Sequence, residues 1–102
     1  MTQGQRTLFT IYFATTGDSV GKSLLEHVAD KFGGYTLSRT SGGWVAPDGQ
    51  LITEPSWRLE IIAIDDSPHN LARIKEIAQR IKREEHQESV VYTYQTLTFC
   101  TV

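Results

Sequence analysis

The sequence of 102 residues is short of cysteine, of positive charge and of long apolar runs, and each shortage excludes a class of protein. The single cysteine, Cys100, excludes an intramolecular disulfide framework and a cysteine-rich zinc site. A formal net charge of -2, from 10 basic and 12 acidic residues, gives no electrostatic case for binding nucleic acid. No run reaches the roughly 18 apolar residues of a membrane span, and residues 1–6 lack the apolar stretch of a signal peptide. We therefore expect a cytoplasmic protein without a membrane contact.

The composition is that of an ordinary globular protein. Hydrophobic residues make up 39% of the chain, aromatic residues 10% and charged residues 22%. Folding a chain of this length hides roughly 65% of the surface of the unfolded chain. We expect residues 1–102 to form one domain with its own hydrophobic core.

The first half of the chain predicts a strand followed by an amphipathic helix. Apolar residues from 7 to 15 indicate a central strand covered on both faces, whereas residues 1–6 are polar and expected to be loose. Asp18 or Ser19 can cap the following helix, and Gly33-Gly34 can end it. Its buried stripe consists of apolar residues spaced by four: Val20, Leu24, Val28 and Phe32.

The next segment predicts two strands joined by a long loop. Residues 35–40 resemble a strand, and residues 41–50 a glycine-rich loop with a turn at Pro47-Asp48-Gly49. A third strand is expected within residues 51–65. Because proline cannot donate to a ladder, its pairing should start after Pro55 or lie at an edge of the sheet.

The second helix has the clearest boundaries. Ser67 is expected to be its N-cap and Pro68 its first residue, and the helix should fade near residues 83–86. Glu76 and Arg80 are spaced to form an ion pair on its surface. Residues 89–96 predict a fourth strand, which residues 97–102 extend or follow with a short edge strand.

The element order is therefore β-α-β-β-α-β. We expect each helix to cross over between parallel neighbouring strands, which places both helices on one face. The predicted fold class is α+β and ferredoxin-like, with a four-stranded antiparallel sheet and two helices on one face. The uncovered face carries large apolar residues that small proteins seldom leave in water, so we expect self-association, as a homotrimer.

Two tempting motifs have simpler interpretations. Gly17 to Ser23 resembles the end of a phosphate-binding loop, but only three residues separate Gly17 from Gly21 where that loop needs four. A helix start with a solvated Lys22 is the favoured interpretation. The three histidines, His27, His69 and His86, lack the spacing of metal ligands, so no metal site is predicted.

The residues most suggestive of a ligand site lie at strand ends. Gln87 and Glu88 precede the last strand, and Glu54 lies at the start of the third strand beside the glycine loop that contains Trp44. A carboxylate, an amide and an indole that converge there could hold a cation or an adenine-like ring. The alternative is that Trp44 and Trp57 serve only as core or interface anchors.

Two arginines on the expected strands have two interpretations. Arg39 and Arg58 could pair with Glu54 or Glu60 across the ladder. They could instead hold an anion at a boundary between subunits. The sequence leaves both open.

Three resemblances extend these expectations. Gly34-Tyr35-Thr36-Leu37, between a helix and a glycine-containing loop, is similar to the passage into the T-loop of PII-like signalling proteins, although Glu85-His86-Gln87-Glu88 stands where those proteins have a basic, glycine-rich loop. That resemblance implies trimers whose sheet faces pack together, with small ligands, often adenine nucleotides, bound between subunits. The chain also resembles an uncharacterised family of small bacterial proteins with a G-x-W…DG…EPS…Q-x-SV pattern, which implies a shared fold.

The third resemblance is to the phage S-adenosylmethionine lyases, which are trimers of PII-like topology. Those enzymes carry a tyrosine after the second strand, a glutamate near the start of the third and a Gln/Glu element before the last. Glu54 and Gln87-Glu88 match the last two features, and Trp44 stands near the expected tyrosine.

Three functional hypotheses follow. The leading one is a PII-like module that binds a small metabolite, similar to an adenine nucleotide or S-adenosylmethionine, at subunit boundaries. In it a mobile loop 41–50 signals to a protein partner, and the ligand-binding residues are Arg39, Gly42, Gly43, Trp44 and Gln87. The alternative is a lyase acting on S-adenosylmethionine, with Glu54 and Glu88 as its electrostatic groups, and the third is a structural or interaction protein. None of these hypotheses requires a cofactor.

Overall fold

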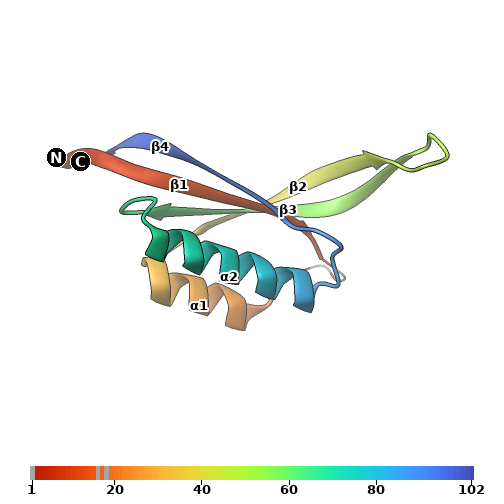
Figure 1. Ribbon diagram of the computed structural model, residues 1–102, viewed down its shortest axis with the longest axis horizontal. Coiled ribbons are helices and arrows are strands. Elements are labelled where there is room, and N and C mark those ends of the chain that lie inside the picture. Colours follow the sequence, from red (N-terminus) through yellow and green to blue (C-terminus); the bar gives the residue numbers. More distant parts are fainter. Residues whose placement is uncertain (1, 16, 18) are drawn as a thin grey trace.

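The protein folds into one sheet with a layer of two helices on one side (Figure 1). The computed structural model describes residues 2–15, 17 and 19–102. The sheet has the strand order β2-β3-β1-β4, and its three pairings are all antiparallel. The elements are β1 (Thr2–Ala14), α1 (Lys22–Phe32), β2 (Thr36–Val45), β3 (Leu51–Ala63), α2 (Pro68–Glu84) and β4 (Val91–Thr101).

This architecture confirms the predicted ferredoxin-like class and corrects one detail of it. The strands joined by a helix were expected to be neighbours, but β3 lies between β1 and β2, and β1 lies between β3 and β4. Each helix therefore crosses over a strand before the chain re-enters the sheet. The two central strands, β1 and β3, carry the face against which both helices pack.

The hydrophobic core lies between the central strands and the helices. Alternate residues of β1 point toward the helices, as the pattern predicts, and so do their cross-strand partners on β3. Both helices contribute one buried stripe to this layer. The completely or almost completely buried side chains are Phe9, Ile11, Val28, Leu59, Ile61, Ile74, Ile77 and Ile81.

The two helices differ in how they begin. Ser67 caps α2 as expected, since its Oγ accepts a hydrogen bond from the Asn70 backbone N–H at 3.4 Å, and Pro68 opens the helix. By contrast, Gly21 is the N-cap of α1 and provides no side-chain hydrogen bond. The predicted capping by Ser19 is therefore wrong, and Asp18 lies outside the described residues.

Surface charges on α2 pair differently from the prediction. Arg80 was expected to pair with Glu76, but its Nε donates to Glu84 Oε2 at 2.8 Å. The Arg80 guanidinium also donates to Ser23 Oγ on α1 at 3.1 Å, which directs the side chain across the helix pair.

Strands extend further than the sequence indicates at both ends of the sheet. Residues 2–6, expected to be loose, continue β1 and pair with residues 97–101 of β4. Residues 41–45, expected to belong to a mobile loop, continue β2 and pair with residues 51–55 of β3. Only residues 46–50 form the turn, where Gly49 has a φ of 87° and the Asp48 carboxylate accepts the Gln50 N–H at 3.0 Å.

The position of Pro55 agrees with one of its two expected placements. Pro55 lies within β3 opposite Ser41 of β2, so pairing does not start after it. The ladder between β1 and β3 ends at Ala14 opposite Ser56, which leaves one side of β3 as an edge at Pro55. A missing N–H is tolerated at such an edge.

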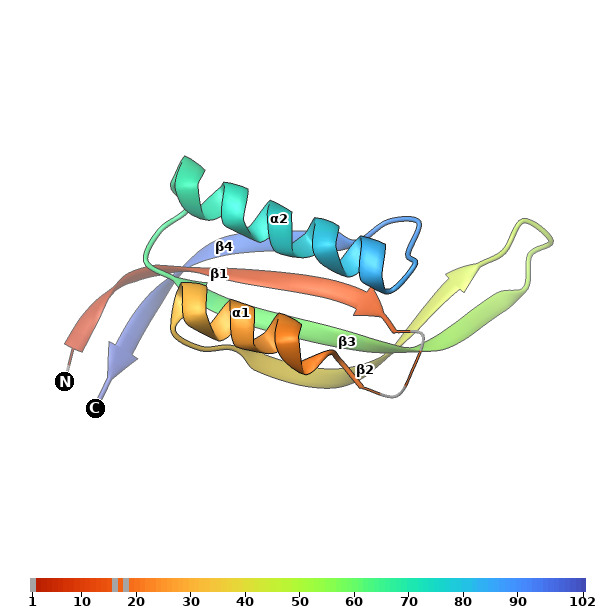
Figure 2. The ribbon, with the colours of Figure 1, turned by 90° about the horizontal axis from the view of Figure 1, so that it is seen from below.

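Two ribbons project beyond the helical layer and give the chain an elongated shape. One is the β2–β3 hairpin of residues 41–55. The other consists of residues 2–6 of β1 paired with residues 97–101 of β4 (Figures 1 and 2). The chain measures 51 × 26 × 26 Å, and its radius of gyration of 15.0 Å exceeds the roughly 13 Å of a compact chain of this length. Each ribbon has only two strands, and a two-stranded hairpin alone is marginally stable in water.

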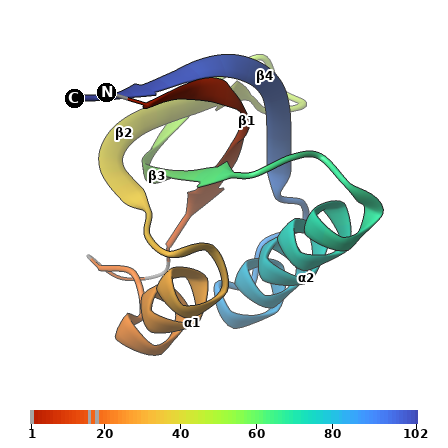
Figure 3. The ribbon, with the colours of Figure 1, turned by 90° about the vertical axis from the view of Figure 1, so that its left-hand side faces the viewer.

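The face of the sheet opposite the helices is bare. In the end-on view of Figure 3 both helices lie on one side of the curled sheet. Tyr12, Ile62, Val91 and Trp44 lie on this open face by register and are each 45–58% exposed. Neither helix in the described part of the chain is long and apolar enough to cross a membrane.

Candidate functional site

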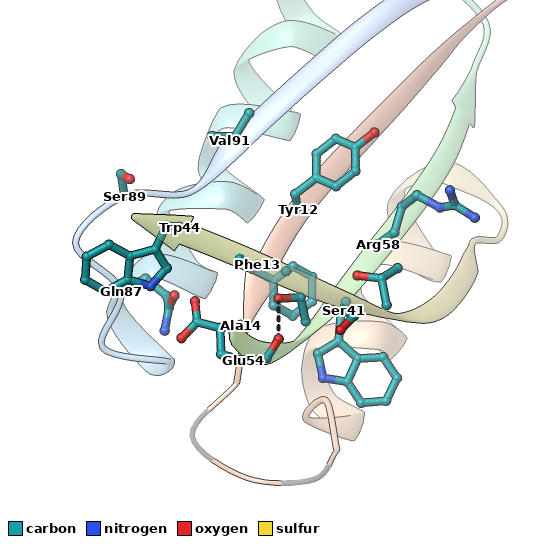
Figure 4. Close-up of a pocket in the computed structure, with 15 residues that line it drawn as sticks. Tyr12, Phe13, Ala14, Ser41, Trp44, Glu54, Arg58, Gln87, Ser89 and Val91 are labelled. Atoms are coloured by element: carbon teal, nitrogen blue, oxygen red, sulfur yellow. Dashed lines mark hydrogen bonds between the residues drawn. The ribbon is translucent and has the colours of Figure 1, made fainter. Parts of the chain in front are cut away.

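A cleft lies on the open face where the β2–β3 hairpin leaves the sheet (Figure 4). We call it the hairpin cleft. Its volume is about 560 Å³, within the range of small-molecule sites. The end of β1, both strands of the hairpin and the segment from Gln87 to Val91 provide its walls, chiefly through Tyr12, Trp44, Glu54, Arg58, Gln87 and Val91.

The hairpin strands approach closely at the base of the cleft because one of them carries glycine there. Gly42 lies opposite Glu54 in the ladder. A Cβ at Gly42 would stand 2.6 Å from Ser56 Oγ, closer than real Cβ atoms approach such an oxygen. The Ser56 hydroxyl itself donates to the Glu54 carbonyl at 3.4 Å. Glycine at position 42 therefore keeps the floor of the cleft open beside Ser56.

The cleft has one acidic and one basic side chain, and only the basic one is paired. Arg58 Nε lies 3.5 Å from the Glu60 carboxylate on the same strand. Glu54 is exposed, and it forms no ion pair with the described residues. In Figure 4 its carboxylate lies between the Trp44–Gln87 side of the cleft and the Arg58 side. The uncompensated charge in the cleft is therefore negative.

A turn after α2 positions Gln87 at the rim. The Gln87 N–H donates to the Lys82 carbonyl at 3.0 Å, and its side-chain nitrogen donates to the Glu85 carbonyl at 2.9 Å. His86 in this turn has a φ of 53°, a left-handed conformation that reverses the chain direction at the end of the helix. These bonds hold the Gln87 amide beside the cleft.

The structure brings together five of the seven residues that the sequence nominated. Glu54 and Gln87 line the hairpin cleft together with three consecutive residues of β2: Gly42, Gly43 and Trp44. Glu88 is exposed and does not line the cleft, although both of its chain neighbours do. The expected convergence of carboxylate, amide and indole is thus present, although Glu54 lies within β3 and not at its start, and Glu88 lies outside the cleft.

Arg39 and Arg58 lie on different sides of the sheet. Arg39 stacks on the Trp57 ring, with its guanidinium carbon 5.4 Å from the ring centroid, on the side that faces the helices. It lines a shallow depression next to Glu54 rather than the hairpin cleft. Arg58 pairs with Glu60 along its own strand, so the predicted ion pairs across the ladder are not the ones formed.

Sequence reasoning missed several cleft residues that only the register brings together. Tyr12 is the direct cross-strand partner of Arg58, and both point into the cleft from the open face. The sequence did offer one signal: side chains alternate along β1, so Tyr12 points to the face of the sheet away from the core residue Phe13. Ser56 reaches the cleft from β3, the strand that also carries Arg58, and Val91 reaches it from β4. The spacing of these residues in the sequence gives no signal of this.

The described residues contain no cluster of His, Cys, Asp or Glu side chains that could hold a metal ion. Cys100 is exposed near the end of β4, on the ribbon formed by the chain termini and away from the cleft. The cleft itself presents a carboxylate, an amide, a guanidinium and aromatic faces to a ligand.

A family model for proteins of unknown function, DUF3574, matches residues 14–100, which include every residue named above in the cleft except Tyr12. The chain belongs to this family. The comparison with curated proteins found no match for this DUF3574 chain.

Solved structures share the fold of the DUF3574 chain. A phage S-adenosylmethionine lyase in complex with S-methyl-5'-thioadenosine aligns with a TM-score of 0.66 at 16% identity over 94% of this chain and 90% of that one. The apo lyase aligns with the same TM-score at 15% identity over 95% and 90%. A PII-like signalling protein from Thermus thermophilus aligns with a TM-score of 0.53 at 24% identity over 97% and 92%. At these identities the similarity shows a common fold.

Proposed function

We propose that this protein is a PII-like module that binds a small adenine-containing metabolite in the hairpin cleft. The observation that carries the proposal is the convergence of Trp44, Glu54 and Gln87, from three separate parts of the chain, on one cavity. An indole can stack on a purine ring, and an amide can hydrogen-bond its edge. The cleft volume of about 560 Å³ suits a molecule of this size.

The charge of the cleft favours a cationic ligand over an adenine nucleotide. Glu54 is unpaired among the described residues, whereas Arg58 is compensated by Glu60. A polyphosphate would meet one free carboxylate and one neutralised guanidinium. A sulfonium such as that of S-adenosylmethionine would instead be attracted to Glu54 and to the face of Trp44.

We further propose that the cleft is completed in a homotrimer. It opens onto the bare sheet face, where Tyr12, Trp44, Ile62 and Val91 are exposed in the single chain. Apolar side chains gathered on one face mark an interaction surface. A second copy seated there would wall off the cleft and place the ligand at a subunit boundary. The hairpin tip, residues 46–50, is the segment best placed to meet a protein partner, because it projects beyond the helices (Figure 2).

A titration with matched ligands tests the binding proposal. We expect isothermal titration calorimetry to detect S-adenosylmethionine, with S-adenosylhomocysteine at least tenfold weaker because it lacks the positive charge on sulfur. Glu54→Gln should remove that difference, and Trp44→Ala should weaken both ligands. Glu26→Gln is the control, because Glu26 is an exposed carboxylate on α1, 3.7 Å from Lys22. The proposal fails if neither ligand nor ATP saturates the protein, or if Glu54→Gln leaves the preference unchanged.

The second candidate is the lyase reaction on S-adenosylmethionine, with Glu54 and Glu88 as electrostatic groups. One observation bears on it: Glu54 lines the cleft and Glu88 does not. When a carbon–sulfur bond of a sulfonium breaks, the electron pair returns to sulfur and its positive charge disappears. A lone carboxylate beside the sulfonium therefore stabilises the ground state more than the transition state. This arrangement suits binding better than cleavage.

Product analysis separates the two candidates. Under the binding proposal, prolonged incubation of concentrated protein with S-adenosylmethionine leaves the ligand intact, as measured by mass spectrometry. Release of methylthioadenosine above the rate of a buffer control, lost in Glu54→Gln, would establish the lyase. The third candidate, a structural or interaction protein, predicts an assembly with no response to either ligand.

A further inference from the structure

A groove runs between the two helices, on the side of the sheet away from the hairpin cleft. We call it the inter-helix groove, and its volume is about 400 Å³. The helices lie side by side and antiparallel (Figures 2 and 3), and arginines of α2 bridge them at both ends. Arg73 Nη1 donates to the Lys31 carbonyl at 3.4 Å, and Arg80 Nη2 donates to Ser23 Oγ at 3.1 Å. These bonds fix the groove walls relative to each other.

Nitrogen donors dominate the lining of this groove. His27 and Lys31 are four residues apart on α1, and His69 and Arg73 are four residues apart on α2. This spacing puts each pair on one face of its helix. The two pairs face the same cavity, in a chain whose net charge is -2.

Arg73 is the most informative of the four. It is partly buried, its guanidinium donates to a backbone carbonyl, and it has no carboxylate within ion-pair distance among the described residues. The other partly buried arginine of α2, Arg80, does have a carboxylate, Glu84 at 2.8 Å. A guanidinium has five N–H donors in a planar fork that matches phosphate oxygens. Most of the Arg73 donors remain to be used by an anion in the groove.

Three carboxylates lie near these donors: one pairs with Lys31, one is held by the loop before α2, and one lines the groove. Asp30 lies 4.0 Å from Lys31 Nζ. Asp65, on the loop before α2, accepts the Ser67 N–H at 3.1 Å and the Asn70 amide at 2.9 Å. The third, Glu76, lines the groove itself. It can accept a hydrogen bond from a ligand that carries a proton next to its negative charge.

We propose that the inter-helix groove binds a phosphate group, free or carried on a small molecule, between α1 and α2. Arg73 provides the positive charge that has no carboxylate partner among the described residues, and Lys31 adds an ammonium that it shares with Asp30. The ring N–H groups of His27 and His69 add hydrogen bonds. Glu76 accepts a hydrogen bond from the P–OH of the monoanion, which distinguishes phosphate from sulfate, because sulfate has no proton at neutral pH. This site is separate from the hairpin cleft and independent of the function proposed for it.

A phosphate titration followed by amide chemical shifts in NMR tests the proposal, with chloride added to hold the ionic strength constant. We expect saturable shifts in residues 27–31 and 69–76, and binding of sulfate at least tenfold weaker than binding of phosphate. Lys31→Gln with Arg73→Gln should weaken phosphate at least tenfold. Lys22→Gln with Arg83→Gln is the matched control, since it removes the same charges from the other end of the two helices and should change phosphate affinity less than twofold.

The exposed carboxylate of Glu76 allows a second test, which does not disturb the contact between Arg73 and α1. Glu76→Gln should reduce the preference for phosphate over sulfate at least fivefold while the chain stays folded. A phosphate monoester that binds more tightly than inorganic phosphate would identify a phosphorylated metabolite as the ligand, and the reverse order would identify the free ion. The proposal is overturned if phosphate and sulfate shift the same residues equally, or if the control variant loses as much affinity as the groove variant.

Discussion

Replacing Gly42 with alanine tests how the floor of the hairpin cleft is built. Gly42 has ordinary strand backbone, so alanine there meets no penalty from φ. Its Cβ, however, would stand 2.6 Å from Ser56 Oγ and 3.5 Å from Ser56 Cβ. Because the second distance is ordinary contact, the conflict arises from the Ser56 hydroxyl alone.

The magnitude follows from two opposing effects. Gly42 and Ser56 are half-buried, so the Ser56 hydroxyl can rotate away, and the cost is chiefly the loss of its 3.4 Å hydrogen bond to the Glu54 carbonyl, about 0.5–1.5 kcal/mol. Replacing glycine by alanine reduces the entropy of the unfolded chain, which stabilises the fold by about 0.4–1 kcal/mol. We therefore expect Gly42→Ala to change the free energy of unfolding by less than about 1 kcal/mol. In a Ser56→Ala background the oxygen is gone, and the same change should stabilise the protein by about 0.4–1 kcal/mol.

Urea unfolding of the four proteins in this cycle measures the coupling between the two sites. The geometry predicts a coupling free energy of about 0.5–1.5 kcal/mol, with the double variant more stable than the sum of the single changes allows. Ligand binding to Gly42→Ala should weaken and recover when Ser56→Ala is added. Additive effects on stability would refute the argument, because they would mean that Ser56 is not what an alanine at position 42 meets.

Three further changes address the core, the start of α2 and the open face. Ile77 is 1% exposed, and Ile77→Ala should lower the free energy of unfolding in denaturant by about 2–5 kcal/mol. Ile64 is 72% exposed, and Ile64→Ala should change it by no more than about 0.5 kcal/mol. Equal losses would contradict the placement of the core. Hydrogen bonds from Ser67 and Asn70 lower the pKa of Asp65, so it stabilises the fold above its ordinary pKa of 3.8 and this stability disappears as the pH falls through the lowered value. Asp65→Asn should therefore reduce the loss of unfolding free energy below about pH 4. If the variant loses as much stability in acid as the unchanged protein, these hydrogen bonds are not the cause. Ile62→Asp, on the open face, should leave the chain folded by circular dichroism but shift it toward single chains in sedimentation velocity, and an unchanged assembly would place the interface elsewhere.

The fold could be predicted from the sequence where local chemistry decides structure. Ser67 followed by Pro68 defines the start of α2, and the alternation of Phe9, Ile11 and Phe13 defines the buried face of β1. These signals depend on residues close in sequence, and the structure agrees with them. The order of elements and the placement of both helices on one face follow from them.

The lengths of the strands could not be predicted in the same way. Residues 2–6 are polar, and residues 41–45 contain two adjacent glycines, so neither segment has the composition of a strand. Both become strands because a partner strand supplies hydrogen bonds, residues 97–101 in one case and 51–55 in the other. Strand pairing over such distances in sequence is a tertiary effect that composition does not record.

The candidate site was predictable in part for the same reason. Gln87 and Glu54 were nominated because each was expected at the start of a strand, and Trp44 because it was expected in the loop beside Glu54. The structure places all three in the hairpin cleft, although Glu54 lies within β3. Glu88 was nominated with its neighbour Gln87, but adjacent residues in a turn do not share a direction. Tyr12 and Arg58 face each other because of the register between β1 and β3, which is known only once the sheet is assembled. The roles of all these residues in binding stay predictions.

Native mass spectrometry of the protein purified directly from cells tests the central claim most directly, because it reports the assembly and any retained ligand together. We predict a particle of three chains of 11.5 kDa each, which carries extra mass that is lost from Trp44→Ala and Glu54→Gln but kept in Glu26→Gln. A particle of one bare chain at micromolar concentration would contradict the claim, since the open face would then be stable in water and the hairpin cleft would have no second subunit to close it.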